Sequence, residues 1–247
     1  LYVLRLGRDD WLLEGGKLVS DSAGVLDFAA VEIDFPLLVA AGNDAARENR
    51  PRLSTFSFGT EWVGTDHFDI GADTDNGADL DLHRDDLIAG GSLVDATLWR
   101  RTGTAWTSMG RIAEPSPGER FGAAVARFGS LIVVGAPAGM TDELIFGNVY
   151  VGTERLSVLP HDAIEGGTRD SYGERVAAAS PTRFVSPASR SAQVAYVFEQ
   201  DAFGSWWESY RLQPLTATPS GFGDQLDADG SLTAIWADSD GGQLYLF

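Results

Sequence analysis

Short apolar segments alternate with polar loops along the whole chain, and no stretch shows a sustained helical period. The segments either alternate apolar and polar side chains or are apolar throughout. They are rich in β-branched and aromatic residues, and Gly, Pro and Asp interrupt them. These features are typical of β-strands. The pattern therefore predicts an all-β protein.

Four kinds of segment recur in a fixed order. The first opens with an aromatic residue and a glycine, as in Phe121-Gly122, Tyr172-Gly173 and Phe222-Gly223, which lie 51 and 50 residues apart. Ile70-Gly71 lies a further 51 residues upstream and is interpreted as another copy. A fixed period of this size indicates that one supersecondary unit is repeated and that neighbouring units complete its core.

The other three segments also have distinct sequences. The second is apolar with small residues (Leu131 to Pro137), the third alternates aromatic and aliphatic residues (Val149 to Val151), and the fourth usually begins at a tryptophan (Trp206). Four short antiparallel strands per period of about 50 residues are the pattern of a propeller blade. We therefore expect a single β-propeller domain with units at approximately 1–51, 52–94, 95–147, 148–192 and 193–247.

The number of blades stays open. The chain starts and ends on a segment of the third kind, and it holds five pairs of first and second segments but six third segments. This count fits five blades with an overhang, or part of a ring of six or seven. The aromatic residue of each aromatic-Gly dipeptide is expected to fill the wedge between blades rather than to stack on a ligand, and the glycine to allow close approach of neighbouring backbone.

One unit carries a family resemblance. The segment Arg120-Phe-Gly-Ala-Ala-Val-Ala-Arg-Phe-Gly-Ser-Leu-Ile-Val-Val-Gly-Ala-Pro137, followed by Gly147-Asn-Val-Tyr-Val151, resembles the FG-GAP repeat of the β-propeller in integrin α subunits and many extracellular proteins. The resemblance extends over 170–247 and is weaker over 1–60, where Phe28-Ala29 replaces Phe-Gly. It implies blades with the Phe-Gly strand innermost and the Trp strand outermost, a secreted or cell-surface location, and a role in binding or adhesion.

Charge narrows the possible partners. The chain has 18 basic and 36 acidic residues, a net charge of −18, and no cysteine. Such a chain repels nucleic acid and anionic membranes, and it cannot form disulfides or thiolate sites. No apolar run approaches the roughly 20 residues needed to span a bilayer. We therefore expect neither a nucleic-acid partner nor membrane insertion. The excess of Asp would serve calcium binding, salt adaptation or solubility.

Residues 72–86 form an acidic insert. Gly122 and Leu131 are 9 residues apart, whereas Gly71 and Leu87 are 16 apart, and the seven extra residues are expected in the hairpin between the first and second strands. Carboxylates clustered without cationic partners repel one another, and a bound divalent cation offsets that repulsion. Alternating oxygen ligands near a glycine are how short acidic loops surround calcium. The expected Ca²⁺ ligands are the carboxylates of Asp73, Asp75, Asp79 and Asp81 and the carbonyl of Gly77.

The resemblance supports this site, because some integrin-type blades carry a calcium loop at the same hairpin. The family's loop has its glycine at the sixth place, whereas Gly77 is the fifth residue from Asp73. Asp85 or Asp86 therefore remains an alternative to Asp81, and a solvated acidic hairpin remains an alternative to the metal site. The similar segment at Asp229-Gly230 has no insert and is interpreted as a turn.

The sequence singles out no catalytic residue. His67, His83 and His161 are expected in polar loops, and none stands beside a serine in a nucleophile motif. A carboxylate pair across the channel would suit glycoside cleavage, but the sequence does not select a pair. Three tryptophans would stack on sugars or pack under the outer strands, with packing favoured: Trp62, Trp106 and Trp207.

These observations predict a calcium-stabilised extracellular binding or adhesion module. It would recognise a protein or glycan through loops around 43–51, 138–147 and 160–170, because loops carry function while strands hold position. One alternative is a polysaccharide-active enzyme, a lyase or glycoside hydrolase, with a deep carboxylate-lined pocket at the channel mouth. Another is a lectin with one aromatic-lined pocket per repeat, which the lack of repeated loop sequences disfavours.

Overall fold

The computed structural model of the protein describes most of the chain. For some strands, β1, β2, β6 and β14 among them, it describes the backbone alone. The described residues are 2–6, 11–17, 26–34, 36–44, 50–58, 62–69, 79–91, 95–115, 118, 120–141, 144–153, 156–160, 172–188, 193–214, 221–238 and 242–247.

These residues form five antiparallel sheets of three or four strands and one two-stranded ribbon. The ribbon is β1 (Tyr2–Leu6) with β2 (Trp11–Lys17). The first sheet holds β3 (Leu26–Asp34), β4 (Leu37–Asp44), β5 (Arg50–Phe58) and β6 (Trp62–Asp69). The second holds β7 (Leu80–His83), β8 (Asp86–Gly90), β9 (Asp95–Thr102) and β10 (Ala105–Ala113).

The remaining three sheets follow in chain order. The third holds β11 (Ala124–Phe128), β12 (Leu131–Thr141), β13 (Leu144–Gly152) and β14 (Leu156–Pro160). The fourth holds β15 (Ala177–Ser180), β16 (Arg183–Ala188), β17 (Val194–Gln200) and β18 (Trp206–Leu212). The fifth holds β19 (Phe222–Asp229), β20 (Leu232–Ala237) and β21 (Gln243–Leu246).

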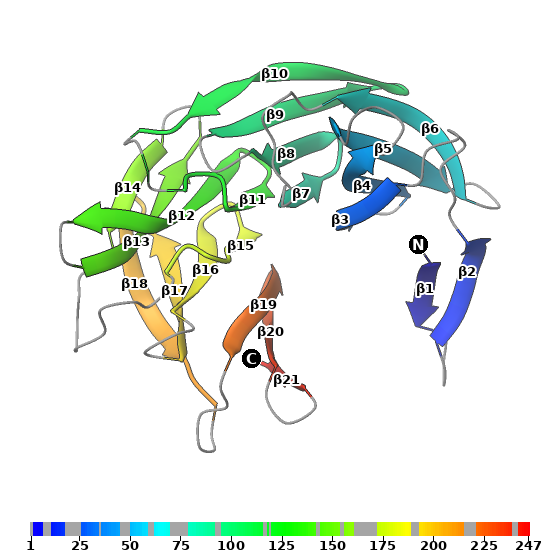
Figure 1. Ribbon diagram of the computed structural model, residues 1–247. Coiled ribbons are helices and arrows are strands. Elements are labelled where there is room, and N and C mark those ends of the chain that lie inside the picture. The colour runs from blue at the N-terminus through cyan, green and yellow to red at the C-terminus, as the bar shows by residue number, and fades with distance from the viewer. Residues whose placement is uncertain are drawn as a thin grey trace.

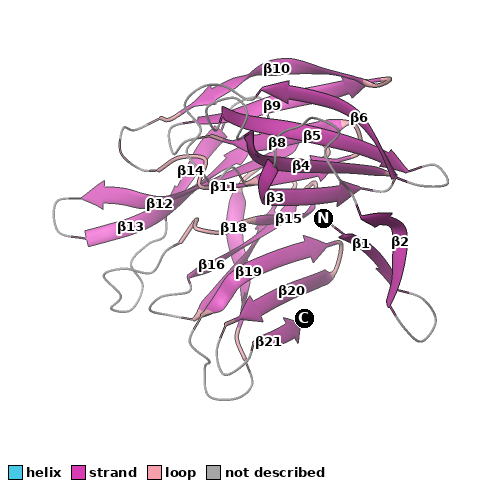
Figure 2. Ribbon diagram, turned by 45° about the vertical axis from the view of Figure 1, so that its right-hand side comes forward, coloured by secondary structure: helices cyan, strands magenta, loops and turns pink. Residues whose placement is uncertain are grey.

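The five sheets stand side by side along an arc, with the first strand of each on its inner side (Figure 1). Consecutive strands pair within every sheet, and the innermost strands contact one another in the order β3, β7, β11, β15 and β19. The β1–β2 ribbon and the fifth sheet are the two ends of this arc (Figure 1, Figure 2). The arrangement is consistent with the blades of a propeller and confirms the all-β prediction.

The strand types follow the predicted order. The second segments form β4, β8, β12, β16 and β20, and the six third segments form β1, β5, β9, β13, β17 and β21. The aromatic-Gly dipeptides at Phe121, Tyr172 and Phe222 open or lead into the innermost strands β11, β15 and β19, whereas Ile70-Gly71 lies outside the described residues. The tryptophan segments begin β2, β6 and β18, and Trp106 is the second residue of β10.

The apolar core lies between successive sheets. Phe121, Tyr172 and Phe222 are fully buried, and each belongs to the cluster that joins its own sheet to the sheet before it. This result confirms the packing interpretation of these three aromatic residues. Burying an aromatic side chain at each junction stabilises the array, because the removal of apolar surface from water is the dominant favourable term in folding.

Two glycines show why the dipeptide needs a residue without a side chain. Gly122 has a φ of 89°, and a Cβ there would lie 2.1 Å from the backbone oxygen of Asp95 in β9. At Gly173, φ is 82° and a Cβ would lie 2.4 Å from the backbone oxygen of Asn148 in β13. The backbone of the preceding sheet thus approaches each glycine closely, as predicted.

The acidic insert does not lie where the spacing predicted. A two-residue turn, Arg84-Asp85, joins β7 to β8, just as Gly129-Ser130 joins β11 to β12. The extra residues therefore precede the innermost strand, and the hairpin placement is wrong. In this register Gly77 stands six residues before the end of β7, as Gly122 stands six residues before the end of β11. Asn76-Gly77, rather than Ile70-Gly71, corresponds to the repeated dipeptide.

Candidate functional site

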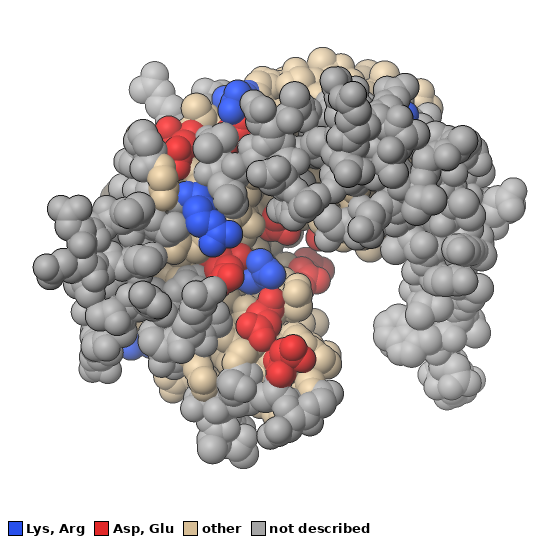
Figure 3. Space-filling view, in the orientation of Figure 1, with Lys and Arg blue, Asp and Glu red and all other residues tan. Residues whose placement is uncertain are grey.

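The innermost strands of all five sheets line one central cavity of about 1010 Å³. Acidic and basic side chains gather along the inner side of the arc, around the hollow in the molecule (Figure 3). Because side chains alternate between the two faces of a strand, the hairpin register decides which residues line this cavity.

The five sheets carry different residue types at one equivalent position of the innermost strand. The residue at this position pairs with the third residue of the next strand, as Asp81 pairs with Ile88 and Ala126 pairs with Val133. Three sheets carry an acid at this position and two carry alanine: Glu32, Asp81, Ala126, Ala177 and Asp227. The acids thus lie on the first, second and fifth sheets, toward one side of the cavity.

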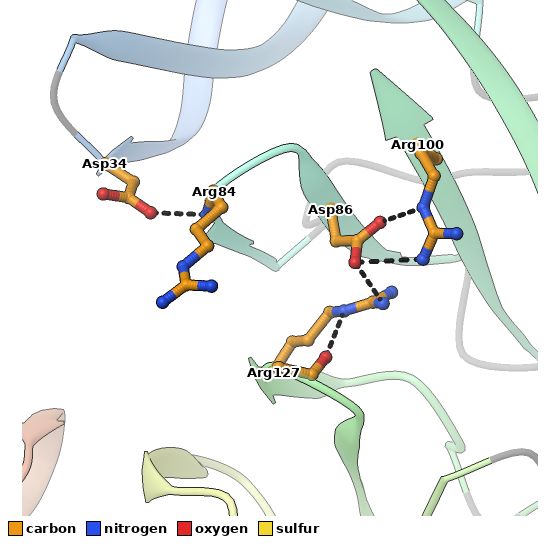
Figure 4. Close-up of polar contacts among 6 residues, drawn as sticks. Asp34, Arg84, Asp86, Arg100 and Arg127 are labelled. Carbon is orange, nitrogen blue, oxygen red and sulfur yellow. Dashed lines mark hydrogen bonds and ion pairs between the residues drawn. The ribbon is translucent and has the colours of Figure 1, made fainter. Parts of the chain in front are cut away.

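Asp79 and Asp81 fasten the second sheet to the third. The backbone N–H of Val125 donates to Asp79 Oδ2 at 2.8 Å, and the backbone N–H of Arg127 donates to Asp81 Oδ2 at 2.5 Å. Both donors belong to β11, whose inner edge has no further strand in its own sheet. The two carboxylates therefore satisfy edge N–H groups that would otherwise be left without a partner strand. Asp34 on the first sheet accepts a hydrogen bond from the backbone N–H of Arg84 in the turn between β7 and β8 of the second sheet (Figure 4).

Three carboxyl groups of the cavity have raised pKa values. Burial, followed by the charges of Asp81, Asp79 and Asp227, raises the pKa of Glu32 to about 9. Burial also raises the pKa of Asp81 to about 7 and that of Asp79 to about 6. In both aspartates the hydrogen bond from β11 opposes this rise, because it stabilises the charged form. The raised pKa of Glu32 favours its protonated form at neutral pH.

Cationic groups stand on the third and fourth sheets. Arg127 is 8% exposed, and its guanidinium lies 2.8 Å from Asp86 Oδ2 on the second sheet. Arg100 holds the other oxygen of Asp86 at 2.7 Å, and Arg127 Nε donates to the carbonyl of Gly129 at 3.1 Å (Figure 4). Arg175, just before β15 of the fourth sheet, donates to the carbonyl of Asp224 on the fifth at 3.0 Å. The contacts of Arg127 with Asp86 and of Arg175 with Asp224 join neighbouring sheets beside the cavity.

The expected calcium ligands divide into two groups. Asp73, Asp75 and Gly77 lie outside the described residues. Asp79 and Asp81 are brought together on one face of the innermost strand β7, where their carboxylate oxygens are the ligand type that calcium prefers. Among the residues that the structure describes, no group of three or more His, Cys, Asp or Glu side chains is placed to hold a metal ion.

The alternative ligands Asp85 and Asp86 take other positions. Asp85 lies in the turn between β7 and β8, and Asp86 is engaged by two arginines. Asp229 ends β19 and Gly230 follows it in the turn with a φ of 58°, which confirms the turn interpretation of this segment.

The histidines differ from the loop prediction where they are described. His83 ends β7 and its ring lies 4.4 Å from the ring of Phe128, while His67 lies within β6. His161 lies outside the described residues. The polar-loop prediction is therefore wrong for His67 and His83.

Packing was predicted for three tryptophans. Trp106 packs on the cluster between the first and second sheets, as predicted, whereas Trp207 is half exposed and only the backbone of Trp62 is described.

The segment 138–147, predicted to be a recognition loop, is mostly strand. Strand β12 extends to Thr141, and β13 begins at Leu144. Residues 161–170 and 45–49 lie outside the described residues.

Sequence reasoning missed Glu32 and Asp227 as cavity residues. Both stand two residues before the end of an innermost strand, as does Asp81. Alignment of the five two-residue turns, rather than of the aromatic-Gly dipeptides, was the signal that would have found them.

Comparison with known proteins assigns no family. No protein-family model matches the chain, and no curated protein sequence matches it. In the part of the chain that the structure describes, no helix is long and apolar enough to cross a membrane.

Proposed function

We propose that the protein is a β-propeller of the FG-GAP type that acts as an extracellular, calcium-stabilised binding or adhesion module. The observation that carries the proposal is the succession of repeated three- and four-stranded antiparallel sheets, joined by buried aromatic residues and closely approached glycines. Such a scaffold holds the loops between strands in fixed positions, and loops on a rigid scaffold are where binding residues concentrate. The expected partner is a protein or a glycan.

Calcium is proposed to bind the acidic segment that leads into β7. Asp73 and Asp75 would supply carboxylates and Gly77 a carbonyl, with Asp79 and Asp81 completing the set. Because Asp79 and Asp81 also accept hydrogen bonds from β11, an ion bound to them would order the junction between the second and third sheets. The cation would further offset the repulsion among carboxylates on one short segment.

A calcium titration followed by isothermal calorimetry tests this site. The double variant Asp73→Asn with Asp75→Asn should lose the binding isotherm that the wild-type chain shows. The matched control is Glu199→Gln with Glu208→Gln, which removes two carboxylates from ion pairs outside the cavity. Equal isotherms for the wild type and the first variant would reject the proposed ligands.

A glycan-cleaving enzyme is the second candidate, because the central cavity is lined by carboxyl groups with different pKa values. Glycoside hydrolysis uses one protonated carboxyl as acid and one carboxylate as base or nucleophile. Glu32 is protonated at neutral pH, and the neighbouring aspartates supply the carboxylate. Hydrogen bonds to β11 instead give Asp79 and Asp81 a structural role, which favours the binding module.

A panel of soluble polysaccharides separates the two candidates when binding and product release are both measured. Binding without product supports the module. Product formation that is lost in Glu32→Gln but kept in Glu199→Gln, a variant at a surface ion pair outside the cavity, supports the enzyme.

A further inference from the structure

The fifth sheet exposes an apolar face that its counterparts bury. Leu244 and Leu246 on β21 are 59% and 62% exposed. They share their face with Leu232 and Trp236 on β20, because Trp236 pairs with Leu244 and Ala234 pairs with Leu246. Large apolar side chains gathered on one face of a sheet mark an interaction surface.

The third sheet shows what this face is built to contact. Its cross-strand pairs Gly135 with Val149 and Val133 with Val151 hold the same register positions. Val149 and Val151 are 0% and 1% exposed, because they pack on the fourth sheet. The exposed face of the fifth sheet is therefore the face that, within the array, receives the following sheet.

At three junctions between consecutive sheets, the third strand of the later sheet contributes a tyrosine. Tyr150 lies 5.1 Å from Phe121 and belongs to the cluster between the second and third sheets. Tyr196 likewise belongs to the cluster between the third and fourth sheets. Tyr245 lies 5.4 Å from Phe222 in the junction between the fourth and fifth sheets. In all three sheets this tyrosine faces the preceding sheet.

The β1–β2 ribbon has the sequence of a third and a fourth strand. Leu1-Tyr-Val-Leu4 corresponds to Ala195-Tyr-Val-Phe198, and Trp11 opens β2 as Trp206 opens β18. Tyr2 thus occupies the register position from which Tyr150, Tyr196 and Tyr245 face a preceding sheet. Among the described sheets, the fifth is the one that exposes the complementary face.

We propose that the exposed face of the fifth sheet is a docking surface for the β1–β2 ribbon of the same chain. The ribbon acts there as the outer half of a sixth sheet and brings the two ends of the arc in Figure 1 together. Leu232, Trp236, Leu244 and Leu246 become buried in this contact, as their counterparts are in the third sheet.

Crosslinking tests the contact cleanly, because the chain contains no cysteine. The variants combine Tyr2→Cys or Leu4→Cys with Leu244→Cys or Leu246→Cys, and each is treated with a flexible bismaleimide over a range of protein concentrations. We expect a crosslink within one chain, of monomeric mass and independent of concentration. The control combines Tyr2→Cys with Phe203→Cys, an exposed position in the turn between β17 and β18, and should stay unlinked.

Two results would overturn the proposal. A crosslink between chains means that a second copy covers the face, and no crosslink means that the ribbon does not reach it.

Hydrogen–deuterium exchange provides a second measurement without cysteines. Leu244→Glu with Leu246→Glu should increase exchange in β1 and β2 severalfold, whereas Met109→Glu, at an exposed position on β10, should not. Unchanged exchange in the ribbon also rejects the contact.

Discussion

Glu32 is the residue at which burial and charge act together against ionisation. Its pKa is raised from 4.5 to about 9, first by burial and then by Asp81, Asp79 and Asp227. The native state therefore holds a proton that the unfolded chain releases over this range. Stability contributed by such a group is present below about pH 4.5 and is lost as pH rises toward about 9.

The variant Glu32→Gln should remove this pH dependence. We expect it to raise the free energy of unfolding by about 1 kcal/mol or more near pH 8 and to change it little near pH 4. Urea denaturation at both pH values measures the difference. Equal effects at the two pH values would show that Glu32 does not carry the buried proton.

Gly122 and Gly129 form a matched pair, because both have positive φ values, 89° and 60°. A Cβ at Gly122 would lie 2.1 Å from the backbone of Asp95, whereas a Cβ at Gly129 would meet no atom within 4 Å. We expect Gly122→Ala to destabilise the protein by about 3 kcal/mol or more and Gly129→Ala by about 1 kcal/mol. Thermal unfolding compares them, and equal losses would contradict the close approach.

Among the strands, side chains join each sheet to its neighbour. The ion pair between Asp86 and Arg127 joins the second sheet to the third, and Arg127 is largely buried. Asp86→Asn should cost about 2–3 kcal/mol, because it leaves a buried cation without its counterion. Glu208→Gln, which breaks an exposed pair with Arg211, should cost at most about 0.5 kcal/mol. Chemical denaturation of both variants checks this difference.

Elements were more predictable than their register. Strand type, order and the buried aromatic residues followed from alternation and from the repeated dipeptide, because these features record which face is buried. The second sheet was misaligned because Ile70-Gly71 matched the period while the turn at Arg84-Asp85 carried no glycine. The contacts of Asp79 and Asp81 with β11 depend on neighbouring strands from different sheets, which one sequence does not reveal.

At the scale of the whole molecule, the net charge of −18 acts on stability through repulsion. Added monovalent salt screens exposed charges over a Debye length of about 10 Å at 0.1 M, so the melting temperature should rise with sodium chloride. A melting temperature independent of salt would mean that the acidic residues do not repel one another appreciably. This general screening must be held constant when the effect of a specific cation is measured.

A thermal melt at fixed ionic strength, first with EDTA and then with calcium or magnesium added, tests the proposed calcium site. We expect a rise in melting temperature that calcium produces and magnesium does not, and that Asp73→Asn with Asp75→Asn abolishes. A ligand that binds only the folded state adds about 2.7 kcal/mol at a hundredfold excess over its dissociation constant. No rise with calcium, or the same rise in the double variant, would contradict the calcium-stabilised module.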